Sequence, residues 1–174
     1  MLIYFEGVDR AGKTTLAKHL AQRIGVPYFK SADTMMKPYD SVLALKYSEM
    51  FLLDMLQQIK TDLVKDRGWL SELVYSSVFG RITNKTMINA LDVLCSRMDV
   101  VIVICEKEEL DFVEDVDVPI NFYKSIIDEY RNRAAMLFTN VIFINMSEFK
   151  LEDGTFDIEA QASYVIEKMK GLTK

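Results

Sequence analysis

The chain has 174 residues, a formal net charge of −5, and a composition that is 50% hydrophobic and 27% charged. This length and balance predict one folded domain with a sizeable core. The negative charge argues against sequence-independent binding of nucleic acid, which normally needs a basic surface. No apolar run approaches the roughly 20 residues that cross a membrane. A strand is predicted at the very start of the chain, which leaves no room for a signal peptide, so we expect a cytoplasmic protein with no membrane partner.

The first predicted elements enclose a phosphate-binding motif. The apolar run at 2–5 predicts a buried strand, and apolar residues four apart predict a helix over 14–24. Between them, residues 7–14 have the form GxxxxGK[ST], the P-loop. In such a loop, glycines let backbone N–H groups turn toward phosphate oxygens. The first helical turn adds unpaired N–H groups and the positive end of its dipole.

The P-loop indicates ATP and Mg²⁺ as cofactors. Lys13 is expected to reach the β- and γ-phosphates, and the Thr14 hydroxyl is expected to hold Mg²⁺. The residues expected to bind ATP are Gly7, Asp9, Arg10, Ala11, Gly12, Lys13, Thr14 and Thr15. The structural alternative is a tight glycine turn followed by a solvated lysine.

The middle of the chain predicts two strands and three helical segments. A strand at 26–30 is followed by a polar loop at 31–40 and by a long helix at 41–60 that is apolar on more than one face. Such a helix is buried on two sides, against a subunit interface or as the wall of a substrate pocket. The remaining segments are a strand at 62–66, a helical or irregular stretch at 69–79 and a helix at 83–98.

The last third of the chain completes the alternation. The β-branched run at 100–105 is typical of a central parallel strand. The following elements are an acidic connector at 106–118, a helix that starts near Pro119 and runs to about residue 137, a strand at 141–145 and a helix at 157–170. Together the elements predict an α/β fold, a P-loop three-layer sandwich whose five-stranded parallel sheet has helices on both faces. We expect one domain, 1–174, with a lid-like segment at about 106–118.

The histidine and the cysteines form no metal-binding pattern. Cys95 and Cys105 are not in a CxxC arrangement and are expected to be buried, reduced thiols. His19 is the only histidine and falls on a predicted helix, so we expect it at the surface or in packing rather than in catalysis. One histidine and two separated cysteines argue against a His/Cys metal site.

A second charged group follows the third predicted strand. Ligands of parallel sheets bind at the carboxyl ends of the strands, so Asp66-Arg67 and the P-loop are expected in one crevice. A nucleotide kinase needs an anion site for its acceptor, and the arginine fork suits a phosphate. Arg67 is the candidate for that site, while Asp66 is expected to orient Mg²⁺ through water or to steer the acceptor. A surface ion pair at a strand end is the alternative.

Residues 5–15, FEGVDRAGKTT, strongly resemble the P-loop of thymidylate kinases, which begin FEG and carry an Asp between the glycines. Asp66-Arg67 matches the DR motif of that family. Residues 69–75, WLSELVY, resemble the segment that follows this motif in phage-encoded thymidylate and deoxynucleotide kinases. The resemblance implies transfer of the ATP γ-phosphate to a deoxynucleoside monophosphate, with dTMP giving dTDP as the expected reaction, and it implies a homodimer.

The resemblance also implies roles on the acceptor side. Asp9 would approach the sugar 3′-hydroxyl, Arg67 would hold the acceptor phosphate, and Glu6 would contact the acceptor side or a Mg²⁺-bound water. The family stacks an aromatic ring on the base, and the candidates for this ring are Tyr47, Phe51, Trp69 and Tyr75. The expected substrate-binding residues are therefore Asp9, Glu6, Arg67, Trp69, Phe51 and Tyr75. The base preference is left open.

Arg10 is the expected source of catalytic charge. Members of the family keep their catalytic arginine in the P-loop or in the lid, and the lid segment here contains Lys107 but no arginine. Arg10 would therefore neutralise charge on the transferred phosphoryl group. An acidic lid would repel phosphates unless a cation intervenes, and Arg131 and Arg133 on the next helix are alternative cations. The expected catalytic residues are Arg10, Lys13, Asp66 and Arg67.

Three other functions are compatible with a P-loop. A deoxynucleoside kinase acting on thymidine would use a carboxylate such as Glu6 to deprotonate the 5′-hydroxyl, although Asp9-Arg10 favours the monophosphate enzyme. A regulatory GTPase would need an NKxD motif, and residues 84–87, NKTM, lack its Asp. A catalytically silent nucleotide-binding module would account for the acidic lid.

Overall fold

A computed structural model of the chain describes residues 1–30, 53–56, 58, 60–80, 86, 90, 91, 93, 95, 97–111 and 119–172. The α-helices (α), strands (β) and 3₁₀ helices (η), in chain order, are β1 (Leu2–Gly7), α1 (Lys13–Ile24), β2 (Tyr28–Lys30), β3 (Leu63–Asp66), α3 (Trp69–Val78), β4 (Val100–Glu106), η1 (Glu109–Asp111), α5 (Ile120–Leu137), β5 (Val141–Asn145), η2 (Met146–Phe149) and α6 (Ile158–Leu172).

The strands form one parallel sheet in the order β2-β3-β1-β4-β5. In the register of the central strands, Leu2 lies between Leu63 of β3 and Val100 of β4. Every residue of β1 and β4 is buried, as expected for strands that are covered on both faces. The five-stranded parallel sheet predicted from the sequence is therefore confirmed.

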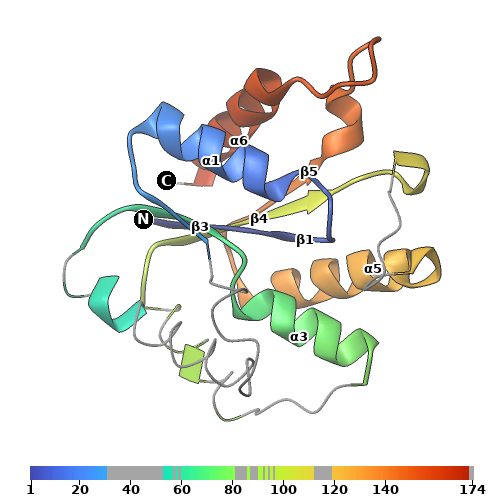
Figure 1. The fold of residues 1–174 in the computed structure, drawn as a ribbon. Coiled ribbons are helices and arrows are strands. Elements are labelled where there is room, and N and C mark those ends of the chain that lie inside the picture. Colours follow the sequence, from blue (N-terminus) through green and yellow to red (C-terminus); the bar gives the residue numbers. More distant parts are fainter. Residues whose placement is uncertain are drawn as a thin grey trace, which may run out of the picture.

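Helices cover both faces of this sheet. Figure 1 shows α1 and α6 on one face and α3 and α5 on the other. Side by side, α1 packs on α6 and α3 packs on α5. The core between these layers is apolar and includes Tyr4, Phe5 and Leu16, which are fully buried. The predicted three-layer α/β architecture is thus confirmed.

Strand β2 is shorter than predicted because the chain is still leaving α1 where the strand was expected to begin. Gly25 ends the helix in a left-handed conformation with φ 71°, and its N–H points back to carbonyls of the last turn. The Val26 N–H also donates to the Ala21 carbonyl, at 3.0 Å. The strand therefore starts only at Tyr28. For the other elements whose bounds the structure gives, the strand and helix boundaries agree with the predictions to within two residues, and Trp69–Val78 is helical.

Several predictions fall partly or wholly outside the described residues. These are the loop at 31–40, most of the helix at 41–60, much of the helix at 83–98 and the lid from 112 to 118. Residues 53–56 and 58 are helical, in agreement with the long helix predicted at 41–60.

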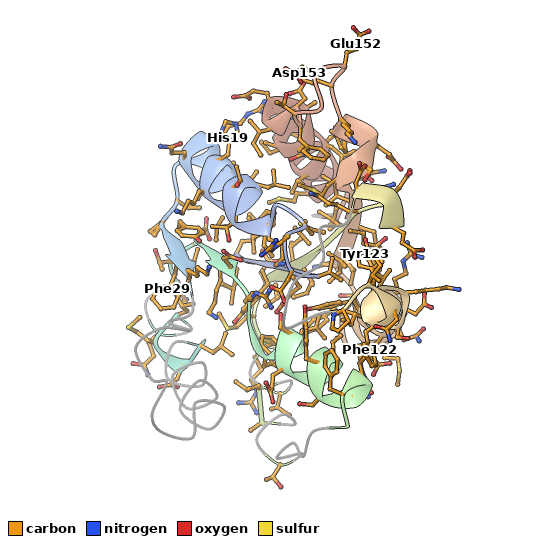
Figure 2. The ribbon with its side chains drawn as sticks, turned by 45° about the vertical axis from the view of Figure 1, so that its right-hand side comes forward. His19, Phe29, Phe122, Tyr123, Glu152 and Asp153 are labelled. Atoms are coloured by element: carbon orange, nitrogen blue, oxygen red, sulfur yellow. The ribbon has the colours of Figure 1, made fainter. Side chains whose placement is uncertain are left out.

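The thiols and the histidine lie where the sequence suggested. Cys95 and Cys105 are buried free cysteines. His19 lies on α1 (Figure 2), and its Nε2 is 2.9 Å from Glu159 Oε1 on α6, a helix-to-helix contact. Within the described part of the chain, no helix is both long enough and apolar enough to cross a membrane.

Candidate active site

The P-loop leaves β1 through a glycine that no other residue could replace without strain. Gly7 has φ 129°, and a Cβ added there would lie 2.1 Å from the Cys105 carbonyl oxygen of β4. Gly12 is the N-cap of α1 and has φ 84°. Both values lie in the region that favours glycine. The loop is therefore pressed against β4 at one end and enters α1 at the other.

The start of α1 provides an anion cradle. In the described structure, no side chain caps this helix N-terminus, so its first N–H groups are available to phosphate oxygens. The buried Lys13 side chain lies across the loop, and its Nζ donates to the Val8 carbonyl. Burial lowers the pKa of the Lys13 ammonium below its usual value. This arrangement fits a polyphosphate, because phosphate oxygens could replace the Val8 carbonyl as the partner of Lys13.

Thr14 and Asp66 form the pair predicted to bind metal. The Thr14 hydroxyl donates to Asp66 Oδ2 at 2.5 Å. Asp66 is only 1% exposed, and its Oδ1 is buried without a hydrogen-bond partner among the described residues. Mg²⁺ prefers oxygen ligands, keeps several waters and usually takes one or two protein oxygens together with phosphates. These two side chains therefore fit Mg²⁺ bound with a nucleotide.

Arg67, Asp9 and Tyr75 meet at the carboxyl edge of the sheet. The Arg67 guanidinium forms an ion pair with Asp9, and the Tyr75 hydroxyl donates to Asp9 Oδ2 at 2.9 Å. The centre of the guanidinium lies 5.9 Å from the centre of the Tyr75 ring. The end of β3, the P-loop and α3 thus each contribute one side chain. The structure brings together three of the residues that the sequence assigned to the acceptor.

Glu6 lies behind this cluster and is 1% exposed. Its Oε1 accepts a hydrogen bond from the Gly68 N–H at 2.8 Å, and its Oε2 accepts one from the Ser71 hydroxyl. Ser71 Oγ is in turn 2.9 Å from the Tyr130 hydroxyl of α5. Burial raises the pKa of Glu6 to about 7, although the Ser71 hydroxyl and the Arg67 charge oppose that rise. Glu6 therefore holds the start of α3, just after Arg67.

The aromatic candidates for base stacking are in different places. Trp69 is 3% exposed and makes edge contacts with Tyr4 and Phe138, at 5.1 and 5.8 Å between ring centres, so it lies in the core. Tyr75 instead stacks on Phe79, with 6.0 Å between ring centres, and the Phe79 ring centre is 5.0 Å from that of Phe122. Tyr47 and Phe51 lie outside the described residues.

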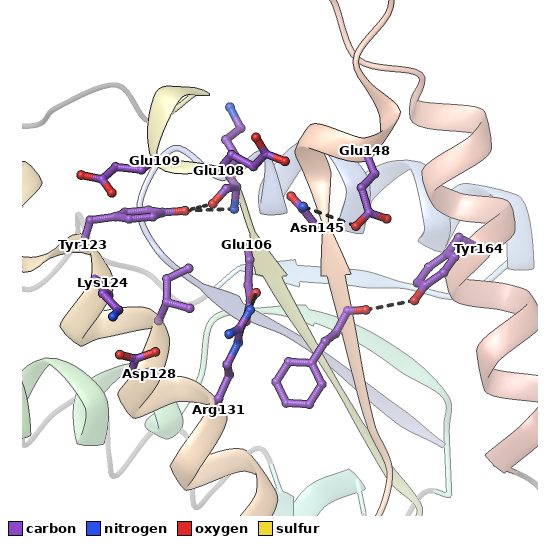
Figure 3. Close-up of a pocket in the computed structure, with 13 residues that line it drawn as sticks. Glu106, Glu108, Glu109, Tyr123, Lys124, Asp128, Arg131, Asn145, Glu148 and Tyr164 are labelled. Atoms are coloured by element: carbon purple, nitrogen blue, oxygen red, sulfur yellow. Dashed lines mark hydrogen bonds and ion pairs between the residues drawn. The ribbon is translucent and has the colours of Figure 1, made fainter.

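Of the arginines considered for catalysis, only Arg10 belongs to the P-loop. It is exposed and has φ 58°. Arg131 on α5 donates through two nitrogens to Glu106, with Nε 2.8 Å from Oε1 (Figure 3). Arg133 Nε lies 2.8 Å from Glu129 Oε1 on the same helix. Both α5 arginines are thus paired with carboxylates.

The described start of the lid is attached to α5 and to the chain after η2. The hydroxyl of Tyr123 (Figure 3) donates to the Lys107 carbonyl. Asp111 forms an ion pair with Lys150. A cavity of about 440 Å³ lies beside this segment, with five carboxylates against three basic groups in its lining. These charged residues are Glu106, Glu108, Glu109, Asp128, Glu148, Lys107, Lys124 and Arg131. This excess of negative charge makes the cavity a poor phosphate site compared with the P-loop.

Sequence reasoning did not identify Tyr28, Ser71 or Tyr130, whose hydroxyls hydrogen-bond at the site. All three lie in elements whose apolar pattern indicated packing. The available signal was their polarity on otherwise buried faces, but the sequence does not say which partner each hydroxyl would meet.

The fold and the P-loop place the chain among proteins with a P-loop kinase fold. YorR protein from Bacillus subtilis, in a crystal structure with phosphorylated GDP, is 18% identical with a TM-score of 0.67, covering 98% of this chain and 96% of that chain. Thymidylate kinase from Ehrlichia chaffeensis is 18% identical with a TM-score of 0.62, covering 97% and 98%. Deoxyadenosine kinase from M. mycoides, bound to dCMP and dCDP as products, is 14% identical with a TM-score of 0.58, covering 98% and 100%. No family model and no curated protein matches the sequence.

Proposed function

We propose that this chain is a nucleoside monophosphate kinase that transfers the γ-phosphoryl group of ATP to a deoxynucleoside monophosphate, with dTMP giving dTDP. The observation that carries the proposal is the Arg67–Asp9–Tyr75 cluster, which stands at the same sheet edge as the P-loop. Phosphoryl transfer depends mainly on positioning and on charge stabilisation. Such a transfer needs one site for the donor phosphates and one for the acceptor phosphate. The anion cradle at the P-loop and the separate Arg67 would provide these two sites.

The donor side of the proposed reaction is assigned to the P-loop. ATP bound with Mg²⁺ would supply the phosphoryl group and a divalent charge beside it. Lys13 and the first N–H groups of α1 would hold the phosphates, while Thr14 and Asp66 would serve the metal ion. Arg10, at the exposed part of the loop, would stabilise the charge on the transferred group.

The acceptor side is assigned to the Arg67 cluster. Arg67 would exchange part of its pairing with Asp9 for a bidentate hold on the acceptor phosphate. Tyr75 fixes Asp9 through its hydroxyl, which supports a role for Asp9 toward the sugar. Of the two candidate rings in the described part of the chain, Trp69 is buried among Tyr4 and Phe138, so Tyr75 is the one beside the proposed acceptor.

The position of Glu6 supports a monophosphate acceptor over a nucleoside. A nucleoside 5′-hydroxyl needs a base, whereas the phosphate of a monophosphate is already ionised near neutral pH. Both oxygens of Glu6 already accept hydrogen bonds, from Gly68 and Ser71. To act as a base, Glu6 would have to break contacts that hold α3. We therefore propose a positioning role for Glu6.

The direct test is ATP-dependent phosphorylation with Mg²⁺ across thymidine, dTMP, dUMP, dGMP, dCMP, dAMP and UMP, followed as ADP and labelled product. Turnover of dTMP without turnover of thymidine supports the proposal. Turnover of thymidine would make the nucleoside kinase correct, and bound ATP without any turnover would leave a silent nucleotide-binding module. We also propose a homodimer, which sedimentation equilibrium of the whole chain would test.

A further inference from the structure

Three oxygen-bearing side chains converge beneath the start of α1. The hydroxyls of Thr14 and Tyr28 both donate to the same atom, Asp66 Oδ2, at 2.5 and 3.0 Å. The other carboxylate oxygen, Oδ1, is buried and has no hydrogen-bond partner among the described residues. A buried polar atom without a partner is costly. Oδ1 is therefore the atom of this group for which a further ligand would be most favourable.

Tyr28 reaches Asp66 from the neighbouring strand. β2 and β3 run parallel, with Tyr28 opposite Val64 and Lys30 opposite Asp66. Residues two apart on a strand share a face, so Tyr28 and Asp66 lie on the same side of the sheet. Lys18 of α1 has its Nζ 5.6 Å from the centre of the Tyr28 ring. The ring is thus held between the sheet and α1, with its hydroxyl at the end nearest the P-loop.

The Thr14 and Tyr28 hydroxyls would interact differently with a bound metal ion. Thr14 Oγ1 can offer a lone pair to a metal ion and still donate its proton to Asp66. Within the described part of the chain, the Tyr28 hydroxyl hydrogen-bonds only to Oδ2. Tyr28 can therefore hold Oδ2 whether or not Thr14 turns to the metal ion.

We propose that Tyr28 is a positioning residue for the metal side of the site: its hydroxyl fixes the Asp66 carboxylate so that Oδ1 serves the water shell of Mg²⁺ bound with the nucleotide. This inference rests on the proposed function, because it requires a Mg²⁺–nucleotide complex at the P-loop. Tyr28 itself touches neither the nucleotide nor the metal ion. Outer partners of metal-site carboxylates typically change metal affinity by about 10–100-fold when they are removed.

The test is Tyr28→Phe, which removes the hydroxyl and keeps the ring. Calorimetry would measure the affinity of the whole chain for ADP twice, once with Mg²⁺ and once with EDTA. We expect wild type to bind ADP more tightly with Mg²⁺. In Tyr28→Phe the gain from Mg²⁺ should fall by about tenfold, while the affinity in EDTA should stay within about twofold of wild type.

Tyr164→Phe is the matched control. It also removes one tyrosine hydroxyl, which donates to the Phe143 carbonyl at 3.2 Å at the other edge of the sheet, and should leave the gain from Mg²⁺ unchanged. Thermal unfolding without nucleotide would show that both variants are folded. An unchanged gain in Tyr28→Phe, or an equal loss of affinity with and without Mg²⁺, would overturn the inference. A wild type that binds no ADP, or that gains nothing from Mg²⁺, would contradict the proposed function itself.

Discussion

Arg67 holds a left-handed backbone conformation, φ 64°, directly after β3. Such a conformation costs on the order of 1 kcal/mol or more in a residue with a side chain. Its N–H donates to the Phe5 carbonyl at 2.9 Å, and its carbonyl accepts from Lys65 Nζ at 2.7 Å. Two hydrogen bonds to the Arg67 backbone, one from a side chain and one to a carbonyl of β1, thus fix the turn that directs this guanidinium toward Asp9. The strain is tolerated at the residue that we propose holds the acceptor phosphate.

Arg67→Ala should raise the KM for the monophosphate by about tenfold or more and change kcat much less, because it removes a charged partner of the acceptor in both the ground state and the transition state. Steady-state kinetics with dTMP varied at saturating ATP would measure this. The control is Arg23→Ala, which replaces an exposed arginine in the last turn of α1. An unchanged KM would remove Arg67 from the acceptor site.

Arg10→Ala should lower kcat by about a hundredfold while leaving the affinity for dTMP unchanged, because it removes one charge donor aimed at the transferred phosphoryl group. Single-turnover kinetics and equilibrium binding of dTMP would separate the two effects. A normal kcat in this variant would show that the charge comes from elsewhere, and the α5 arginines would then need testing.

Glu6→Gln should change stability in a pH-dependent way. Because the pKa of Glu6 is about 7 in the fold against an ordinary value of 4.5, its stabilising contribution is complete below pH 4.5 and is lost as the pH rises through 7. Gln does not titrate, so the stability of wild type relative to Glu6→Gln should fall by about 2–3 kcal/mol between pH 5 and pH 8. Urea unfolding at both pH values would measure it. Equal stability differences at the two pH values would contradict the raised pKa of Glu6.

At the scale of elements, some of the architecture could be predicted because the local signals were unambiguous. The β-branched run of β4 can be buried on both faces only as a central strand, and the structure places it there. The glycines and the lysine of the P-loop pattern predict a strand, a turn and a helix in succession. Asp66-Arg67 lies at the carboxyl end of a strand. Because ligands of parallel sheets bind at the carboxyl ends of the strands, this position predicted that Asp66-Arg67 lies beside the P-loop, whatever the strand order.

Other features could not be predicted because they depend on which faces meet. The helical pattern of α3 shows that Trp69 and Tyr75 lie near an apolar face, but not that Trp69 points to Tyr4 while Tyr75 points to Asp9. Glu6 precedes the P-loop in sequence, but its hydrogen bonds go to α3, more than sixty residues away. Such pairings arise only from tertiary packing.

Gly7→Ala should destabilise the fold strongly, because a Cβ there would meet the Cys105 carbonyl at 2.1 Å and φ 129° is unfavourable for alanine. We expect a loss of about 3 kcal/mol or more in the free energy of unfolding. Gly25→Ala is the matched control, since it also has positive φ but nothing lies within 4 Å of an added Cβ. It should lose only about 1 kcal/mol. Equal losses in chemical unfolding would show that the close approach to β4 is unimportant.

For the molecule as a whole, the sheet brings the two proposed substrate sites to one edge and separates the helices that serve them. The P-loop opens onto α1 on one face, while Glu6 and Tyr75 connect the cluster to α3 on the other. The similar solved structures share the fold at 14–18% identity, which shows how little of the sequence the fold requires. Specificity is then a property of the few side chains that line the edge.

The direct succession of Glu6 and Gly7 has a mechanical consequence. Glu6 is hydrogen-bonded to the helix that carries the acceptor-side tyrosine, and Gly7 is the first residue of the P-loop. Their Cα atoms are about 3.8 Å apart across one rigid peptide unit. When thermal motion displaces the end of β1, both sites move with it. Under the proposed function, flexing of the sheet would therefore leave the path between donor and acceptor almost unchanged in length and would preserve the alignment of the two substrates.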